Sequence, residues 1–145
     1  MTFHGINRSG AELYAQLSDY TRENVSGWVW ENVMPHLSGD NRITRPELAQ
    51  QIRDFLKAYE HVEIWADCCS YDWVLFCELY GSPAGVPANV FANPFDLQTL
   101  FWAKGFDASI DRQEFSGVRG TRHHALIDAR VSMKHAELEQ ANRTT

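Results

Sequence analysis

Apolar residues at helical spacing predict the clearest element of the chain, a helix that follows Thr44. Thr44 suits the N-cap position, Pro46 suits the first turn, and Glu47 completes a capping box with Thr44. The apolar positions that follow are three or four residues apart and share one face: Leu48, Ile52, Phe55, Leu56 and Tyr59. We interpret this helix as structural, with that face turned toward the core.

Three further stretches carry helical patterns. One covers about residues 24–37, one follows Asp72, and one runs from Leu126 toward the C-terminus, while Asp96 is predicted to cap a fourth, short helix. Each apolar set predicts the face that packs inward. For residues 24–37 the set is Val25, Trp28, Val29, Val33 and Leu37, and for the helix after Asp72 it is Val74, Leu75 and Leu79. For the C-terminal helix the set is Leu126, Ala129, Met133 and Ala136, and for the short helix capped by Asp96 it is Leu97, Leu100 and Phe101.

Two stretches have the character of strands. Residues 11–17 alternate between apolar and polar side chains, and residues 62–67 are mostly apolar, as is typical of a strand inside a sheet. The chain up to Gly10 is predicted to be a short loop, and residues 105–120 a polar loop. Strands that alternate with helices indicate the α/β class, and residues 1–145 suit a single domain.

Composition narrows the class of protein. With 44% hydrophobic and 12% aromatic residues the chain is globular, and it contains no run of roughly 20 apolar residues that would span a membrane. The N-terminus lacks the features of a signal peptide, and three cysteines with no C-x-x-C spacing predict reduced thiols. We therefore expect a cytoplasmic protein. A net charge of −6 argues against a broad, nonspecific grip on nucleic acid.

Two histidines and an aspartate lie near the start of the last predicted helix. His124 and Asp128 are four residues apart and share a helix face, whereas His123 and Asp128 are five apart, about 140° around the helix axis. A histidine that titrates near neutrality beside a metal-binding carboxylate is suited to activating water. Spacing alone does not choose between the histidines, and on spacing alone we favour a solvated helix start in which Asp128 interacts with the helix dipole.

A second pair of carboxylates brackets the predicted junction between a strand and a helix. Asp67 ends the apolar stretch of residues 62–67, and Asp72 lies at the start of the helix that follows. Open α/β sheets bind ligands at such junctions. Alternatively, Asp67 or Ser70 caps the helix and Asp72 interacts favourably with its positive end.

Two groups of residues are candidates for contacts with nucleic acid. Trp28 and Trp30 would suit base stacking, although aromatic residues at this spacing more often lie in the core, and we favour the core. Arg112, Arg119 and Arg122 lie in or beside the polar loop before the histidines and would suit a phosphate. A solvated loop is an equally good interpretation of the arginines.

These residues together resemble the DEDDh (DnaQ-like) 3′-5′ exonucleases, and most closely the compact 3′-5′ exoribonucleases with a Trp-rich second motif. The resemblance rests on an apolar strand leading to Tyr71-Asp72-Trp-Val, a Pro-Phe-Asp-Leu element at residues 94–97, and His123-His-Ala-Leu-Ile-Asp128. It covers about residues 10–138. It implies a ribonuclease H-like mixed sheet flanked by helices, and metal-dependent hydrolysis of RNA or single-stranded DNA from a free 3′ end.

The resemblance also implies roles for individual residues. His123 matches the general base of the family, and His124 matches a variable neighbour. Asp128 and Asp72 match metal-binding aspartates of a two-metal site that takes Mg²⁺ or Mn²⁺, with the metals about 4 Å apart. Arg119 and Arg122 are weaker candidates for binding the substrate phosphate.

The chain departs from the family pattern at its start. The family begins with a strand that carries Asp-x-Glu, whereas the first acid here is Glu12, on a strand that resembles the third strand of the family. We expect an N-terminally incomplete domain that lacks its first strands and is nearly inactive as it stands. The alternatives are a catalytically inactive nucleic-acid-binding or scaffold module of the same fold, substitute metal ligands at Glu63 and Asp67, or an unrelated α/β domain.

Overall fold

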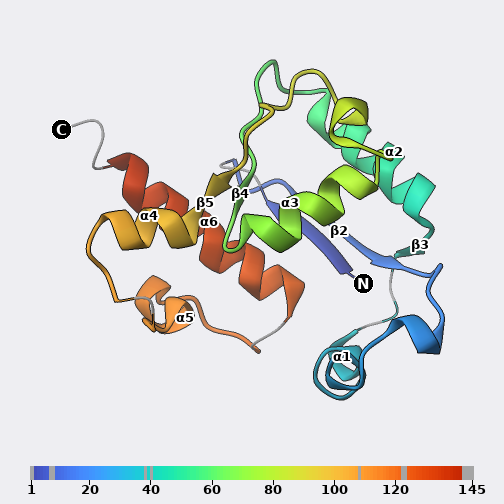
Figure 1. Cartoon of the computed structure of the whole chain (residues 1–145), viewed down its shortest axis with the longest axis horizontal. Helices are drawn as coiled ribbons and strands as arrows, with labels where there is room; N and C mark the ends of the chain where they lie inside the picture. Colours follow the sequence, from blue (N-terminus) through green and yellow to red (C-terminus); the bar gives the residue numbers. More distant parts are fainter. Residues whose placement is uncertain are drawn as a thin grey trace.

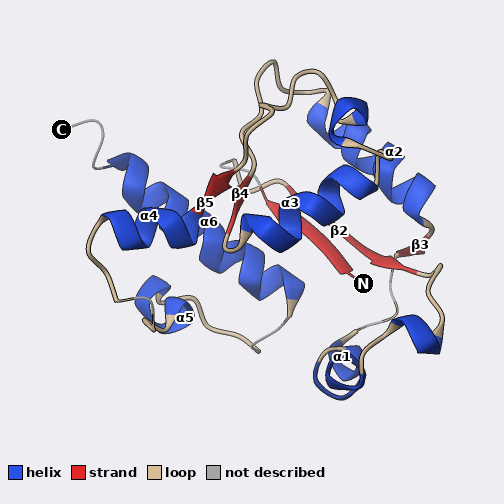
Figure 2. Cartoon of the chain, in the orientation of Figure 1, coloured by secondary structure: helices blue, strands red, loops and turns tan. Residues whose placement is uncertain are grey.

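The protein is a mixed α/β domain with short strands and six α-helices in the part of the chain that is described (Figures 1 and 2). The computed structural model describes residues 2–6, 9–37, 39, 41–107, 109–121 and 124–141, with side chains for those between 9 and 137. The strands are β1 (Thr2–Ile6), β2 (Glu12–Leu17), β3 (Arg42–Ile43), β4 (Trp65–Ala66) and β5 (Phe95–Asp96). The helices are α1 (Gly27–Asn32), α2 (Arg45–Leu56), α3 (Cys69–Glu78), α4 (Leu97–Ala103), α5 (Arg112–Ser116) and α6 (Ala125–Ala141).

The described strands form two separate sheets. In the first, β1 is antiparallel to β2, and β2 is parallel to β3. In the second, β4 is parallel to β5, and a parallel bridge between Val62 and Val90 extends the pairing. The strand predicted over residues 11–17 is confirmed as β2, but the loop predicted before Gly10 is wrong because Thr2–Ile6 pairs with β2 along its whole length.

Helix α2 confirms the predicted capping box and much of the predicted inward face. The Thr44 backbone N–H donates to Glu47 Oε2 at 2.8 Å, so the first turn begins where the sequence indicates. Leu48, Ile52 and Leu56 are buried. They form the main core with residues from β2, from α3 and from the connection to β5: Ala15, Leu17, Phe76 and Val90.

Helix α3 and its C-cap turn inward a face that shares only Leu79 with the predicted one. Phe76 and Cys77 are buried, whereas Val74 and Leu75 are exposed. Trp73 and Phe76 stack with their ring centroids 5.5 Å apart, which places the aromatic side of the helix against the core. The segment is apolar on both sides, so its periodicity did not determine the orientation.

The stretch predicted as one helix over residues 24–37 contains α1 and a 3₁₀ turn, Met34–His36, and it begins where another 3₁₀ turn, Arg22–Asn24, ends. Both tryptophans of α1, Trp28 and Trp30, are exposed, so the prediction that they lie in the core is wrong. The Arg22 guanidinium lies over the Trp30 ring, 4.5 Å from its centroid. Because the segment is short and interrupted, it does not present one continuous apolar face to the core.

The C-terminal part of the chain packs beside both sheets. Helix α6 contacts β1, β4, α4 and α5, and Figure 1 shows it running alongside the short β4–β5 sheet. Its start is confirmed near Leu126, but the polar loop predicted over 105–120 contains helix α5, which Asp111 caps. No helix of the described residues is long and apolar enough to cross a membrane.

Candidate functional site at the ends of two parallel strands

Two aspartates mark the carboxyl ends of the paired strands β4 and β5. Asp67 follows β4 directly, and Asp96 is the last residue of β5. Because the strands are parallel, with Ala66 opposite Asp96, both strands end at the same edge of the sheet. Helices α3 and α4 start there and lead away in opposite directions (Figure 1). This edge is where open α/β sheets place ligands.

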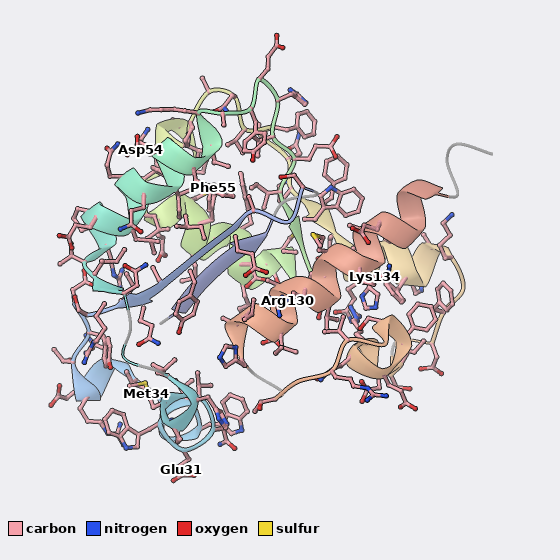
Figure 3. The ribbon with its side chains drawn as sticks, turned by 180° about the vertical axis from the view of Figure 1, so that it is seen from behind. Glu31, Met34, Asp54, Phe55, Arg130 and Lys134 are labelled. Carbon is pink, nitrogen blue, oxygen red and sulfur yellow. The ribbon has the colours of Figure 1, made fainter. Side chains whose placement is uncertain are left out.

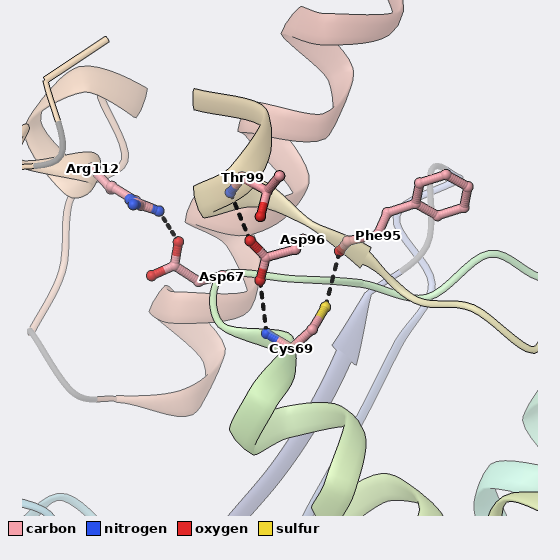
Figure 4. Close-up of polar contacts among 6 residues, drawn as sticks. All are labelled: Asp67, Cys69, Phe95, Asp96, Thr99 and Arg112. Atoms are coloured by element: carbon pink, nitrogen blue, oxygen red, sulfur yellow. Dashed lines mark hydrogen bonds and ion pairs between the residues drawn. The ribbon is translucent and has the colours of Figure 1, made fainter. Parts of the chain in front are cut away.

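The Asp96 carboxylate ties the starts of two helices together (Figure 4). One oxygen accepts the backbone N–H of Cys69 at 3.0 Å, and the other accepts that of Thr99 at 2.6 Å. The second bond confirms Asp96 as the cap of α4. Burial alone would raise the pKa of Asp96, but these hydrogen bonds, with the Arg112 guanidinium nearby, hold it below the usual value. Asp96 therefore remains an anion that fixes the backbone of the junction.

Asp67 forms an ion pair with Arg112, from the first turn of α5 (Figure 4). The guanidinium also lies 5.1 Å from the centroid of the Phe101 ring. Asp67 is therefore engaged by an arginine, and Cys68 rather than Asp67 occupies the N-cap position of α3. Arg112, which the sequence suggested for a phosphate, is held by a carboxylate instead.

Asp72 lies in the first turn of α3, as predicted, and is accessible to solvent. Partial desolvation raises the pKa of its carboxyl group above the usual value, and the negative charge of Asp67 raises it further. A hydrogen bond from the Cys68 backbone partly offsets both effects. A carboxylate in this situation gains from a nearby cation, because positive charge favours its ionised form.

Asp128 lies in the first turn of α6 and is exposed. The backbone N–H groups of Ile127 and Asp128 both donate to the carbonyl of His124, at 2.8 and 3.0 Å, so the helix starts directly after His124. Arg130, two residues further along α6 and labelled in Figure 3, donates to Glu12 Oε1 at 2.9 Å and so fastens this end of the helix to β2. The structure thus holds Asp128 at a defined place beside the first sheet.

Among the described residues, the predicted site does not form a cluster of metal ligands. His123 and Arg122 lie outside the described residues. Arg119 is exposed and lines an open hollow with Gln113 and Gly120. Over the described parts of the chain, no three His, Cys, Asp or Glu side chains are grouped so that they could hold a metal ion.

The substitute ligand pair that the sequence suggested, Glu63 and Asp67, is divided between different partners. The Trp65 indole N–H donates to Glu63 Oε2 at 3.2 Å, whereas Asp67 pairs with Arg112. Together with the lack of a three-residue metal group among the described side chains, this separation speaks against a metal centre built on the pair.

Two residues beside the junction were not anticipated as parts of the site. Sequence reasoning gave Asp96 only a capping role, although an aspartate at the end of each of two parallel strands could have indicated the cluster. His135 is buried in α6 against Phe101, with ring centroids 4.9 Å apart, and burial lowers the pKa of its imidazole. No sequence signal pointed to His135, since its position depends on how α4 and α6 pack.

The thiol of Cys69 should react slowly with alkylating reagents. Burial and the nearby Asp96 carboxylate raise the pKa of Cys69 from about 9 to about 11. At pH 8 its thiolate fraction is then roughly 100-fold below that of a thiol with the ordinary pKa. Iodoacetamide labelling followed by peptide mass spectrometry should show a Cys69 rate that still rises about tenfold per pH unit between pH 8 and 10.

Urea-unfolded protein provides the control for this measurement, because unfolding removes both the burial and the fixed carboxylate. Cys69 should then react at the rate of an ordinary cysteine and level off near pH 9. A folded-state rate that levels off at the same pH would contradict the prediction.

The fold and the junction define a class: a mixed α/β domain with acidic side chains gathered where two parallel strands end. The family described as "3′-5′ exoribonuclease Rv2179c-like domain" matches residues 13–139. This chain belongs to that family. The matched region includes the two strand-end aspartates, Asp67 and Asp96. It also includes Asp72 and Asp128.

Two curated relatives carry exoribonuclease names. The chain is 25% identical over 138 residues to "3′-5′ exoribonuclease Rv2179c" of Mycobacterium tuberculosis strain ATCC 25618 / H37Rv. It is equally similar to "3′-5′ exoribonuclease MT2234.1" of strain CDC 1551 / Oshkosh. Each match covers 92% of this chain and 79% of the relative.

Proposed function

We propose that this domain is a metal-dependent 3′-5′ exonuclease of the DEDDh type with a ribonuclease H-like fold, acting on RNA. The observation that carries the proposal is the family match over residues 13–139, which takes in both Asp72 and Asp128. RNA is favoured over single-stranded DNA because both curated relatives are named exoribonucleases. The substrate is a single strand with a free 3′ end.

Asp72 and Asp128 would hold the metal, and their chemistry suits Mg²⁺ or Mn²⁺. Both are carboxylates, the ligands that these hard cations prefer, and the raised pKa of Asp72 reflects a group that positive charge would stabilise. A bound pair of metals stabilises charge on the scissile phosphate and lowers the pKa of a water. Two carboxylates are too few for two metals, so the complete site requires further acidic ligands.

His123 would act as the general base. An imidazole that titrates near pH 6.5 is largely neutral at pH 7 and can accept a proton from the attacking water. In the sequence His123 directly precedes His124, whose carbonyl receives the first backbone hydrogen bonds of α6. Arg119 and Arg122 would bind phosphates of the strand.

A catalytically inactive nucleic-acid-binding module of the same fold is the second candidate. Two observations favour it. The described side chains contain no three-residue group that could hold a metal ion, and Asp67 is engaged by Arg112 instead of lying free beside a second carboxylate. This candidate predicts RNA binding without hydrolysis.

The two candidates differ in an assay on 5′-labelled single-stranded RNA, run with Mn²⁺ and with chelator. The chain should be compared with a version to which an N-terminal segment carrying Asp-x-Glu has been added. A metal-dependent ladder that shortens from the 3′ end, strongest in the extended version, supports the exonuclease. Binding without cleavage by both folded proteins would support the inactive module instead.

A further inference from the structure

An exposed aromatic ring stands directly beside Asp72. Tyr71 is 72% exposed, and among the described residues its ring contacts no other aromatic ring. Val74 and Leu75 lie three and four residues further along and are also exposed, so they share the outer face of α3 with Tyr71. An aromatic and apolar face next to a carboxylate junction calls for an explanation, because the core of the domain uses the opposite face of the helix.

The backbone that carries Tyr71 is firmly held. Asp96 accepts the N–H of Cys69 at 3.0 Å, and the Cys69 thiol donates to the carbonyl of Phe95 at 3.2 Å (Figure 4). The N–H of Tyr71 itself donates to the carbonyl of Cys68 at 3.1 Å. The ring therefore projects from a fixed helix start, which is what a binding platform requires.

We propose that Tyr71 is a substrate-binding residue whose ring stacks on an unpaired base of the RNA strand. The inference rests on the proposed function, because it takes Asp72 as the place where the backbone phosphate is processed. Adjacent residues of a helix have Cα atoms about 3.8 Å apart and point about 100° apart, so a phosphate at Asp72 brings its nucleotide within reach of Tyr71. Every base offers a π-face, so the contact fits an enzyme without strong sequence preference.

The test is RNA binding by variants at two equally exposed aromatic residues. Affinity for a fluorescein-labelled single-stranded RNA, measured by anisotropy with Ca²⁺, should fall roughly 5- to 150-fold in Tyr71→Ala. Tyr71→Phe should bind within about twofold of the parent because it keeps the ring. Trp102, 76% exposed at the far end of α4, is the matched control, and Trp102→Ala should bind as the parent does.

Abasic RNA separates stacking from a merely structural effect. Three oligonucleotides would each lack one base, at the last, second-last or third-last position. The parent and Tyr71→Ala should bind one of the three with equal affinity. Tyr71→Leu, which keeps an apolar side chain but loses the π-face, should behave like Tyr71→Ala. The inference would be overturned if the parent and Tyr71→Ala bound intact RNA with equal affinity. It would also be overturned if Tyr71→Ala lowered the affinity by the same factor on every abasic RNA.

The outcomes also distinguish this inference from the proposed function. Tyr71-dependent, base-dependent binding with no cleavage by either version of the chain would keep the stacking residue and remove the exonuclease. Cleavage from the 3′ end with the same KM in the parent and Tyr71→Ala would keep the exonuclease and remove the stacking role of Tyr71. A dimer in sedimentation that Tyr71→Ala disrupts, without base dependence in binding, would assign this face to a second copy and overturn the inference.

Discussion

Replacing His123 by alanine should lower the rate of RNA shortening roughly 100- to 10,000-fold in the version of the chain that cleaves, because removing a general base has effects of that size. Initial rates on 5′-labelled RNA with Mn²⁺ measure the change. The parent should also lose activity as the pH falls below about 6.5, where an ordinary imidazole becomes protonated and can no longer accept a proton. His123→Ala should lack that acidic limb.

His124→Ala is the matched control, since the two histidines are neighbours. The backbone carbonyl of His124 receives the hydrogen bonds that start α6, and alanine retains that carbonyl. We expect at most a few-fold loss of activity from this variant, because no proton transfer is removed. The reverse ranking, with His124→Ala inactive and His123→Ala active, would move the general base to the residue that shares a helix face with Asp128.

Local signals in the sequence predicted those elements whose ends are set by neighbouring residues. The capping box of Thr44 and Glu47 is such a signal, and the structure confirms it. Asp96 as the cap of α4 is another, because its partner, the N–H of Thr99, lies three residues away. The same pattern at Asp111 and Glu114 starts α5, so a capping argument would also have found this helix inside the predicted loop.

The features that the sequence did not predict depend on contacts between distant segments. Strand β1 is defined by its pairing with β2, and its own short sequence lacks a clean alternation. Asp67 and Arg112 are 45 positions apart, so no spacing argument could join them. The orientation of α3 was undetermined because both of its faces carry apolar residues, and packing against the core selected one.

The candidate site also combines features that local sequence signals predict with features that depend on contacts between distant segments. The sequence located Asp72 and Asp128 at the starts of two helices, and the structure agrees. It did not show that Asp96 holds the start of α3, a long-range contact on which the position of Asp72 depends. The network around the junction therefore links the fold to the proposed chemistry: loss of the Asp96 carboxylate would loosen the helix that carries Asp72 without removing any predicted ligand.

Replacing Leu48 by alanine and replacing Leu75 by alanine should have very different effects on the free energy of unfolding. Leu48 in α2 is 1% exposed and part of the main core, so Leu48→Ala should lower the free energy of unfolding by about 2–5 kcal/mol. Leu75 in α3 is 38% exposed, so Leu75→Ala should change it by no more than about 1 kcal/mol. Urea unfolding followed by circular dichroism measures both.

The comparison is informative because sequence periodicity turned Leu75 inward and the structure turns it outward. If Leu75→Ala costs as much as Leu48→Ala, the exposed face of α3 is buried in the folded protein, and Tyr71 would lose its access to RNA as well. A small effect at Leu75 beside a large one at Leu48 fixes the rotation of α3 about its axis. That rotation determines where Asp72 and Tyr71 point, and so it underlies both the metal-ligand and the stacking proposals.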